Sequence, residues 1–289
     1  MQLMLEVTPP SRRASDSKAR ASADRVCLAV KGMGRVDYLN VPEIIEENYL
    51  GAPLYKHYDA REFCALLRRG TGIASIPNKV VVYLSSAHDL ESWIYESISR
   101  YGMDRLIFVG GSKGGSIYPG PSVAEANRAA ARVGGVAVGN VCIPSRDGEL
   151  SRVLSKTESG ASFFTTQVMF ESAPVIRLIG GYGTECERLG IRPAAFFISL
   201  PAPKNSFDID FLKWLGADMS AGTEAALRRS RNIGLESNRI CSGVLSDVED
   251  YARSSGIKVP IGLNVEAISE ANLDEVCTFV NALRTEGLL

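Results

Sequence analysis

The stretch that decides the fold is Phe163–Phe170, which reads FFTTQVMF. Apolar residues surround the polar step Thr165-Thr166-Gln167, and a buried parallel strand normally reads as a nearly continuous apolar run of this kind. A long amide near the end of such a strand needs hydrogen-bond partners or a ligand. In an α/β barrel, chemistry sits at the carboxyl ends of the strands. Gln167 is therefore either a pocket residue or a buried amide bonded to neighbouring backbone.

Similar apolar runs alternate with longer amphipathic segments along the whole chain. Eight short runs rich in Val, Ile, Leu or Phe are predicted as strands, at Leu3–Val7, Arg35–Leu39, Lys79–Leu84, Arg105–Val109, Val136–Cys142, Ser162–Val168, Ala194–Leu200 and Ile257–Leu263. Helices are predicted at Ser11–Val30, Asp59–Arg69, Asp89–Arg100, Ser122–Arg132, Glu149–Ser159, Glu171–Leu189, Phe207–Leu215, Glu224–Gly234, Glu236–Ser255 and Asn272–Arg284. Eight strands alternating with helices predict parallel βαβ units that close into a (β/α)₈ TIM barrel.

The size of the chain fits this prediction. It has 289 residues, and one (β/α)₈ barrel typically takes about 250. No Gly/Ser/Pro-rich linker divides the chain, so we expect a single domain over residues 1–289.

The composition excludes several classes of function. Hydrophobic residues make up 45%, charged residues 22%, and the net charge is −1, which gives no electrostatic basis for binding nucleic acid or a membrane. The six cysteines are scattered without a CxxC pair, and there are only two histidines, so neither a disulfide framework nor a multi-histidine metal site is expected. No signal peptide or long apolar span is visible, and the chain is expected to be cytoplasmic. Apolar outer helices leave a homo-oligomer open.

Glu6 is the candidate catalytic residue. It lies in the first predicted strand, on the face opposite Leu3, Leu5 and Val7, and that face points inward in a closed barrel. Burial raises the pKa of a carboxyl group and so makes a proton donor available near neutral pH. The alternatives are an ion pair at the bottom of the barrel or an exposed glutamate on a frayed strand.

The fourth strand runs into Gly110–Gly115, which contains Ser112 and Lys113. Glycines after a strand let backbone N–H groups approach phosphate. Neither the Walker spacing nor a GxGxxG fingerprint is present, so the segment is a phosphate-binding loop or simply a flexible one. Other polar strand ends (Asn40 after the second strand, Tyr83 and Ser85 after the third, Asn264 and Glu266 after the eighth) indicate a lined cavity.

Three segments together resemble the methylenetetrahydrofolate reductase family in its short, single-domain form. Leu5–Pro10 resembles the family's FEFFPP first strand, and Lys156–Ala161 followed by Thr166-Gln167 resembles its K-V-D-A-G-A…T-Q segment. Ser199-Leu200-Pro201, with Phe211 ten residues past the proline, resembles its G-I-L/M-P strand end. The order and approximate spacing of these matches agree over essentially the whole chain.

The resemblance implies a flavin-carrying barrel of one-carbon metabolism that reduces 5,10-methylenetetrahydrofolate to 5-methyltetrahydrofolate with NADH or NADPH, through FAD. It implies that Glu6 is the general acid that opens the five-membered ring to an iminium. Gln167, Phe211 and Asn264 would then bind the folate or pterin substrate. The cofactor would be held by Asn40, Tyr83, Ser112, Lys156 and Ala161.

The chain departs from the family pattern at the expected flavin site. The family's L-R-G-D strand end is Val109–Ser112, and its H-L-T histidine is Tyr83. Its fifth-strand tyrosine is Ile143, and its eighth-strand arginine is Val265. These departures leave three alternatives to the FAD enzyme: a flavin-free NAD(P)H-dependent relative, a pterin-binding barrel that transfers a one-carbon group without redox chemistry, and a non-catalytic subunit.

Overall fold

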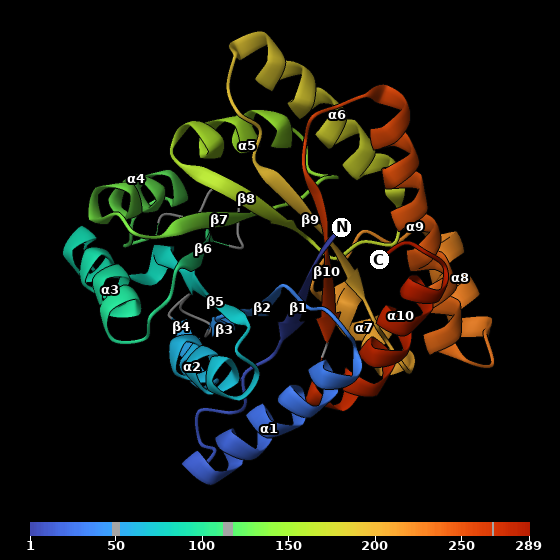
Figure 1. Cartoon of the computed structure of the whole chain (residues 1–289), viewed down its shortest axis with the longest axis horizontal. Coiled ribbons are helices and arrows are strands. Elements are labelled where there is room, and N and C mark those ends of the chain that lie inside the picture. Colours follow the sequence, from blue (N-terminus) through green and yellow to red (C-terminus); the bar gives the residue numbers. More distant parts are fainter. Residues whose placement is uncertain (48–52, 112–117, 268) are drawn as a thin grey trace.

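The computed structural model describes residues 1–47, 53–111, 118–267 and 269–289. Within them, eight parallel strands close into a barrel in the order β1-β10-β9-β8-β7-β6-β5-β2, and helices surround it (Figure 1). The predicted (β/α)₈ barrel is therefore confirmed. The barrel strands are β1 (Gln2–Val7), β2 (Tyr38–Val41), β5 (Ala74–Val80), β6 (Arg105–Val109), β7 (Ala137–Cys142), β8 (Ala161–Thr166), β9 (Ala195–Pro201) and β10 (Ile261–Ala267).

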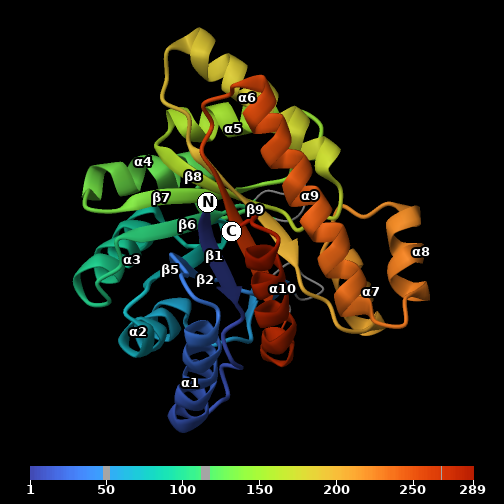
Figure 2. The same ribbon diagram turned by 45° about the vertical axis from the view of Figure 1, so that its right-hand side comes forward.

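The predicted helices are all present, but α1 begins at Asp16 instead of Ser11, and α8 ends at Arg229 instead of Gly234. They are α1 (Asp16–Gly32), α2 (Ala60–Thr71), α3 (Ala87–Ser99), α4 (Val123–Val133), α5 (Glu149–Glu158), α6 (Ser172–Leu189), α7 (Ser206–Trp214), α8 (Ala221–Arg229), α9 (Ile233–Ser255) and α10 (Leu273–Thr285). Three of them, α7, α8 and α9, follow β9 without an intervening strand and lie together on one side of the barrel (Figure 2).

Local sequence signals place the helix ends. At α4, the Ser122 hydroxyl accepts from the N–H of Glu125, and the Glu125 carboxylate accepts from the N–H of Ser122. This reciprocal capping box satisfies two backbone donors that a helix start leaves unpaired. Gly134 ends the same helix with a φ of 74°, a conformation that disfavours residues with a Cβ.

The middle of the barrel is filled by an apolar layer, which we call the barrel plug: Met4, Ile76, Ile107, Phe163 and Phe197. The two phenylalanine rings meet edge to face, with centroids 6.1 Å apart. Each lies against a glycine of the neighbouring strand, Gly139 for Phe163 and Gly262 for Phe197, and a Cβ at either glycine would overlap the ring. In the plug, each phenylalanine ring therefore fills the space beside a glycine, which has no side chain. This apolar layer separates the two ends of the barrel.

Three predicted strands were misplaced. The second lies at Tyr38–Val41 instead of Arg35–Leu39, the third at Ala74–Val80 instead of Lys79–Leu84, and the eighth at Ile261–Ala267 instead of Ile257–Leu263. In each case the true strand carries a polar residue near its carboxyl end, which interrupts the apolar run that the prediction followed. Val81–Tyr83 instead forms the short 3₁₀ helix η1.

Two small elements were not predicted. The short strands β3 (Ile45–Glu47) and β4 (Pro53–Tyr55) pair antiparallel outside the barrel sheet (Figure 1). The short 3₁₀ helix η2 (Glu270–Asn272) precedes α10.

No membrane-spanning helix is found in the part of the chain that the structure describes. None of its helices is long and apolar enough to cross a membrane. The six cysteines are free, and no cluster of three or more His, Cys, Asp or Glu side chains in the described ranges is arranged to hold a metal ion.

Candidate functional site

Glu6 points into the carboxyl-terminal mouth of the barrel. It lies two residues beyond Met4 of the plug on the same face of β1, so its carboxyl group is above the plug and not at the bottom of the barrel. The side chain is only partly exposed. The geometry therefore places Glu6 where (β/α)₈ enzymes carry their chemistry.

Two asparagines from the neighbouring strands hold the Glu6 carboxyl group. Asn40 Nδ2 on β2 donates to Glu6 Oε2 over 2.6 Å, and Asn264 Nδ2 on β10 donates to the same oxygen over 3.3 Å. Asn264 Nδ2 also lies 2.9 Å from Ser199 Oγ. Because both amide donors meet Oε2, Oε1 is the oxygen left to carry a proton. The structure thus brings together three of the predicted site residues.

A second carboxyl group, Glu266, completes this acid–amide cluster. Glu6 and Glu266 are register partners on the adjacent parallel strands β1 and β10, and Glu266 Oε1 accepts from Asn264 Nδ2 over 3.3 Å. Two carboxyl groups so close together cannot both ionise easily. Glu266 was visible in the sequence as a polar strand-end residue, but nothing in the sequence paired it with Glu6.

The protonation of the two acids follows from this geometry. Burial raises the pKa of Glu6 from 4.5 to about 7, although the hydrogen bonds from Asn264 and Asn40 pull it down in part. Burial and then the charge of Glu6 raise the pKa of Glu266 well above its ordinary value. Both acids are therefore held toward the protonated form, and the charge of one disfavours ionisation of the other.

The side-chain carbonyl oxygens of the same two asparagines accept no hydrogen bond. Asn40 Oδ1 and Asn264 Oδ1 are buried without a hydrogen-bond partner. A buried carbonyl oxygen without a partner costs about 1–3 kcal/mol. Both amides are turned this way because their N–H groups are held by carboxyl oxygens. Both oxygens are closed to solvent, so this cost falls within the buried part of the cluster.

Gln167 and Phe211 lie on one side of the mouth. Gln167 follows the end of β8, and its Nε2 donates to the backbone oxygen of Leu215 over 2.7 Å. Phe211, in the last turns of α7, is 40% exposed and stacks on Trp214 with ring centroids 5.8 Å apart. Gln167 thus anchors the end of the helix that presents Phe211. Its carboxamide and the Glu6 carboxyl group share the same end of the barrel, because Gln167 follows β8 and Glu6 is the penultimate residue of the parallel strand β1.

The remaining predicted cofactor residues are not gathered around this cluster. Lys156 Nζ donates to the backbone oxygen of Val141 over 2.7 Å, which holds it between α5 and β7 on the outer wall. Ala161 is the first residue of β8, at the amino-terminal end of the barrel. Tyr83 follows β5 at the mouth and packs edge to face on Tyr118, with centroids 5.5 Å apart. Ser112 lies outside the described residues.

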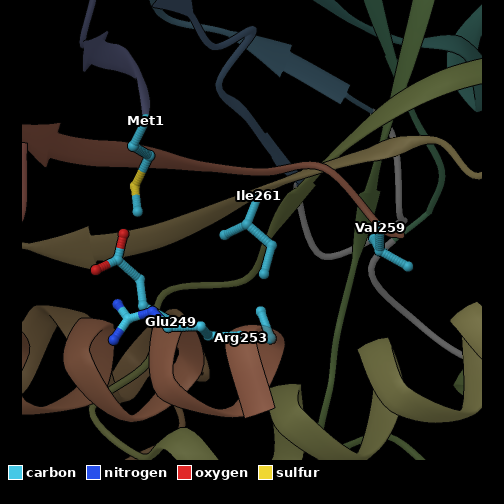
Figure 3. A pocket seen from close by; sticks show the side chains of 6 residues that line it. Met1, Glu249, Arg253, Val259 and Ile261 are labelled. Atoms are coloured by element: carbon cyan, nitrogen blue, oxygen red, sulfur yellow. The ribbon is translucent and has the colours of Figure 1, made fainter. Parts of the chain in front are cut away.

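Two cavities lie near the ends of the barrel. One, of about 270 Å³, is at the amino-terminal end, among Met1, Val259, Ile261 and the side chains of Glu249 and Arg253 (Figure 3). The plug separates it from Glu6, so it is not part of the candidate site. The other, of about 630 Å³, lies at the carboxyl-terminal end and includes Asn78 and Lys79.

The fold and the cluster define a (β/α)₈ barrel protein with an acid–amide site at its carboxyl-terminal mouth. The sequence profile of the family described as mycobacterial methylenetetrahydrofolate reductase matches residues 2–235, and the chain belongs to that family. The family resemblance of the sequence is thereby confirmed. A search of curated protein sequences gave no significant match.

Among solved structures, an uncharacterized protein from Clostridium thermocellum, described as binding two copies of 5-methyl-5,6,7,8-tetrahydrofolic acid, has a similar fold. The TM-score is 0.80 at 15% sequence identity, over 99% of this chain and 96% of that one. At this identity the similarity supports the barrel fold alone.

Proposed function

We propose that the protein reduces 5,10-methylenetetrahydrofolate to 5-methyltetrahydrofolate with NAD(P)H, and that Glu6 is the proton donor. The observation that carries the proposal is the Glu6 carboxyl group, which has a pKa of about 7 and is braced by two asparagines with unused carbonyl oxygens. Family membership and the methyltetrahydrofolate bound by a protein of the same fold support a folate ligand.

Glu6 and Glu266 are partly exposed acceptors at the mouth. A reduced pterin ring presents several N–H donors, which suit such acceptors. Phe211, partly exposed on α7, would cover the ring or the adjoining aromatic group by stacking.

The proton step uses the free oxygen of Glu6. At neutral pH about half of the Glu6 side chains carry a proton, and the amide contacts to Oε2 direct it to Oε1. Donation of this proton to the weakly basic bridging nitrogen breaks its bond to the methylene carbon and leaves an iminium, which accepts a hydride from NAD(P)H. Burial and the charge of Glu6 both favour the neutral form of Glu266, and the new Glu6 carboxylate lies opposite the cation.

The flavin-free form of this reaction fits the residues better than the FAD-dependent form. Of the residues expected to hold FAD, Lys156 is bound to the outer wall and Ala161 is at the far end of β8, while Asn40 is bonded to Glu6. This donor set does not fit a flavin. Direct hydride transfer requires only that the nicotinamide lie against the folate at the mouth.

One experiment separates the candidates. The purified protein is expected to be colourless at about 450 nm, where bound flavin absorbs, and to oxidise NADH or NADPH only when methylenetetrahydrofolate is added. A yellow protein would favour the FAD-dependent form. A protein that binds folate without consuming either dinucleotide would favour a non-redox pterin-binding barrel or a non-catalytic subunit.

A further inference from the structure

Glu266 has no role in the proton step proposed for Glu6, although it lies beside that residue. The two are register partners on the adjacent parallel strands β10 and β1. Register partners point to the same face of a sheet, so both carboxyl groups are turned toward the mouth, where both side chains are partly exposed. A second acid in this place is unfavourable if both groups ionise, because like charges repel. Its presence beside the proton donor therefore calls for a function.

The hydrogen-bond donors around the two acids are too few for two carboxylates. Asn264 Nδ2 lies 2.9 Å from Ser199 Oγ, and it lies 3.3 Å from both Glu6 Oε2 and Glu266 Oε1. An amide nitrogen carries two hydrogens, so these three contacts cannot all be made at once. Asn40 Nδ2 adds one donor to Glu6, and the Ser199 hydroxyl adds one to Glu266. None of these donors reaches Glu6 Oε1.

The surroundings of the pair contain no compensating charge. The side chains that face it come from β2 (Asn40), β9 (Ser199) and β10 (Asn264), and all three are uncharged. Burial is the largest influence on both acids and raises the pKa of each, and in the described residues no Lys or Arg lowers either value. A neutral carboxyl group carries an O–H, which is the kind of donor that the pair lacks.

We propose that Glu266 is a positioning residue of the proton step: its neutral carboxyl group donates its O–H to the Glu6 carboxylate that forms when Glu6 gives up its proton. This inference rests on the proposed function. The hydrogen bond gains strength as the Glu6 O–H bond breaks and the negative charge develops, so it favours the transition state over the bound substrate. Glu266 keeps its own proton throughout, and solvent at the partly exposed mouth returns one proton to Glu6 in each turnover.

Two substitutions at position 266 separate this role from a structural one. Glu266→Leu removes the O–H, whereas Glu266→Gln replaces it with an N–H that can serve the same carboxylate. The two variants are compared with the wild type at acidic pH, where Glu6 is protonated in every variant. We expect kcat of Glu266→Leu to fall about tenfold, as for the loss of one hydrogen bond to a charged group. Glu266→Gln should recover most of kcat.

Thr8→Val is the matched control. Thr8 follows the end of β1 at the mouth, and its Oγ1 donates to the backbone oxygen of Ala267 over 3.5 Å, next to Glu266 in the chain but outside the cluster. This variant also removes a polar group from the mouth, and its kcat should equal that of the wild type. A loss as large as in Glu266→Leu would show a general disturbance of the mouth and would overturn the assignment to Glu266.

The pH dependence of kcat tests the charge of Glu266. Activity needs protonated Glu6, so it falls as the pH rises through the pKa of Glu6. If Glu266 is the neutral donor, Glu266→Gln keeps a donor, and activity falls over the same pH range as in the wild type. If Glu266 is instead ionised beside Glu6, its replacement removes a like charge and lowers the pKa of Glu6. A loss of activity displaced to lower pH in Glu266→Gln would therefore overturn the inference.

Infrared spectroscopy gives a readout that needs no turnover. The C=O band of a protonated carboxyl group that is absent from Glu6→Gln belongs to Glu6, and its titration with pH gives the pKa of Glu6 in each variant. We expect this pKa to rise in Glu266→Leu, which lacks the donor, and to stay unchanged in Glu266→Gln. If the band responds in this way but methylenetetrahydrofolate is not reduced, the contact between the two acids stands and the proposed function does not. If reduction is intact and neither kcat nor the band responds to Glu266→Leu, the proposed function stands and this inference fails.

Discussion

Glu6→Gln should change how the stability of the protein depends on pH, whether or not a substrate is present. The carboxyl group has an ordinary pKa of 4.5 and a pKa of about 7 in the folded protein. Between these values the folded state binds the proton and the unfolded chain does not, so folding becomes weaker as the pH rises. Each pH unit inside this window is worth about 1.4 kcal/mol.

Between about pH 5 and about pH 8, the Glu6 carboxyl group should therefore cost the wild type on the order of 2 to 3 kcal/mol of unfolding free energy. Glutamine cannot ionise, so the variant should lose less stability over the same interval. Removal of the Glu6 charge also lowers the pKa of Glu266 in the folded protein, which further reduces the loss of stability of the variant as the pH rises.

Urea denaturation at the two pH values measures this difference. Glu158→Gln, at the exposed end of α5, is the matched control and should follow the wild type. Parallel stability profiles for Glu6→Gln and the wild type would refute the claim that Glu6 is held as a protonated acid in the folded protein.

Three further changes test neighbouring parts of the structure. Glu266→Gln should weaken the loss of stability as the pH rises above 4.5, the ordinary pKa of the group, because burial and the Glu6 charge raise the pKa of Glu266 in the folded protein; a urea-unfolding profile over pH that runs parallel to the wild type would contradict this. Gln167→Ala should raise KM about tenfold with little change in kcat, since it removes the anchor of the helix that presents Phe211; an unaltered KM would leave Gln167 a purely structural residue. Gly139→Ala should destabilise the barrel by about 1–3 kcal/mol in urea unfolding, because its Cβ would overlap the Phe163 ring, and Phe163→Leu in the same chain should recover part of the loss; an additive double variant would speak against that contact.

Most of the barrel could be predicted from the sequence, because its outer helices have clear caps and most of its strands are apolar runs. The strands that were misplaced are those that carry the polar residues Asn40, Asn78, Asn264 and Glu266 near their carboxyl ends. Polar residues at a barrel mouth break the hydrophobic pattern, so pattern reading fails where the candidate site begins. A polar residue that interrupts an apolar run can itself indicate a strand end at the mouth, and Asn78 could have been found in this way.

Glu6, Asn40 and Asn264 could be singled out as strand-end polar residues, but not as a bonded cluster. Their contact depends on the register of β1 with β2 and β10, and strands separated by more than two hundred residues carry no sequence mark of that register. Lys156 and Ala161 were assigned by motif position alone. The structure places them on the outer wall and at the opposite end of the barrel, because the motif spans a helix end and a strand start.

The role of Glu6 as proton donor to a bound folate is tested most directly by dinucleotide oxidation with methylenetetrahydrofolate in the wild type and the Glu6→Gln variant, alongside calorimetric binding of the folate. We expect the wild type to consume one NADH or NADPH for each methyltetrahydrofolate formed. The variant should bind folate but turn over about 10²–10⁴-fold more slowly, the usual loss for a missing general acid. Equal turnover in the two proteins would contradict the proposed role of Glu6.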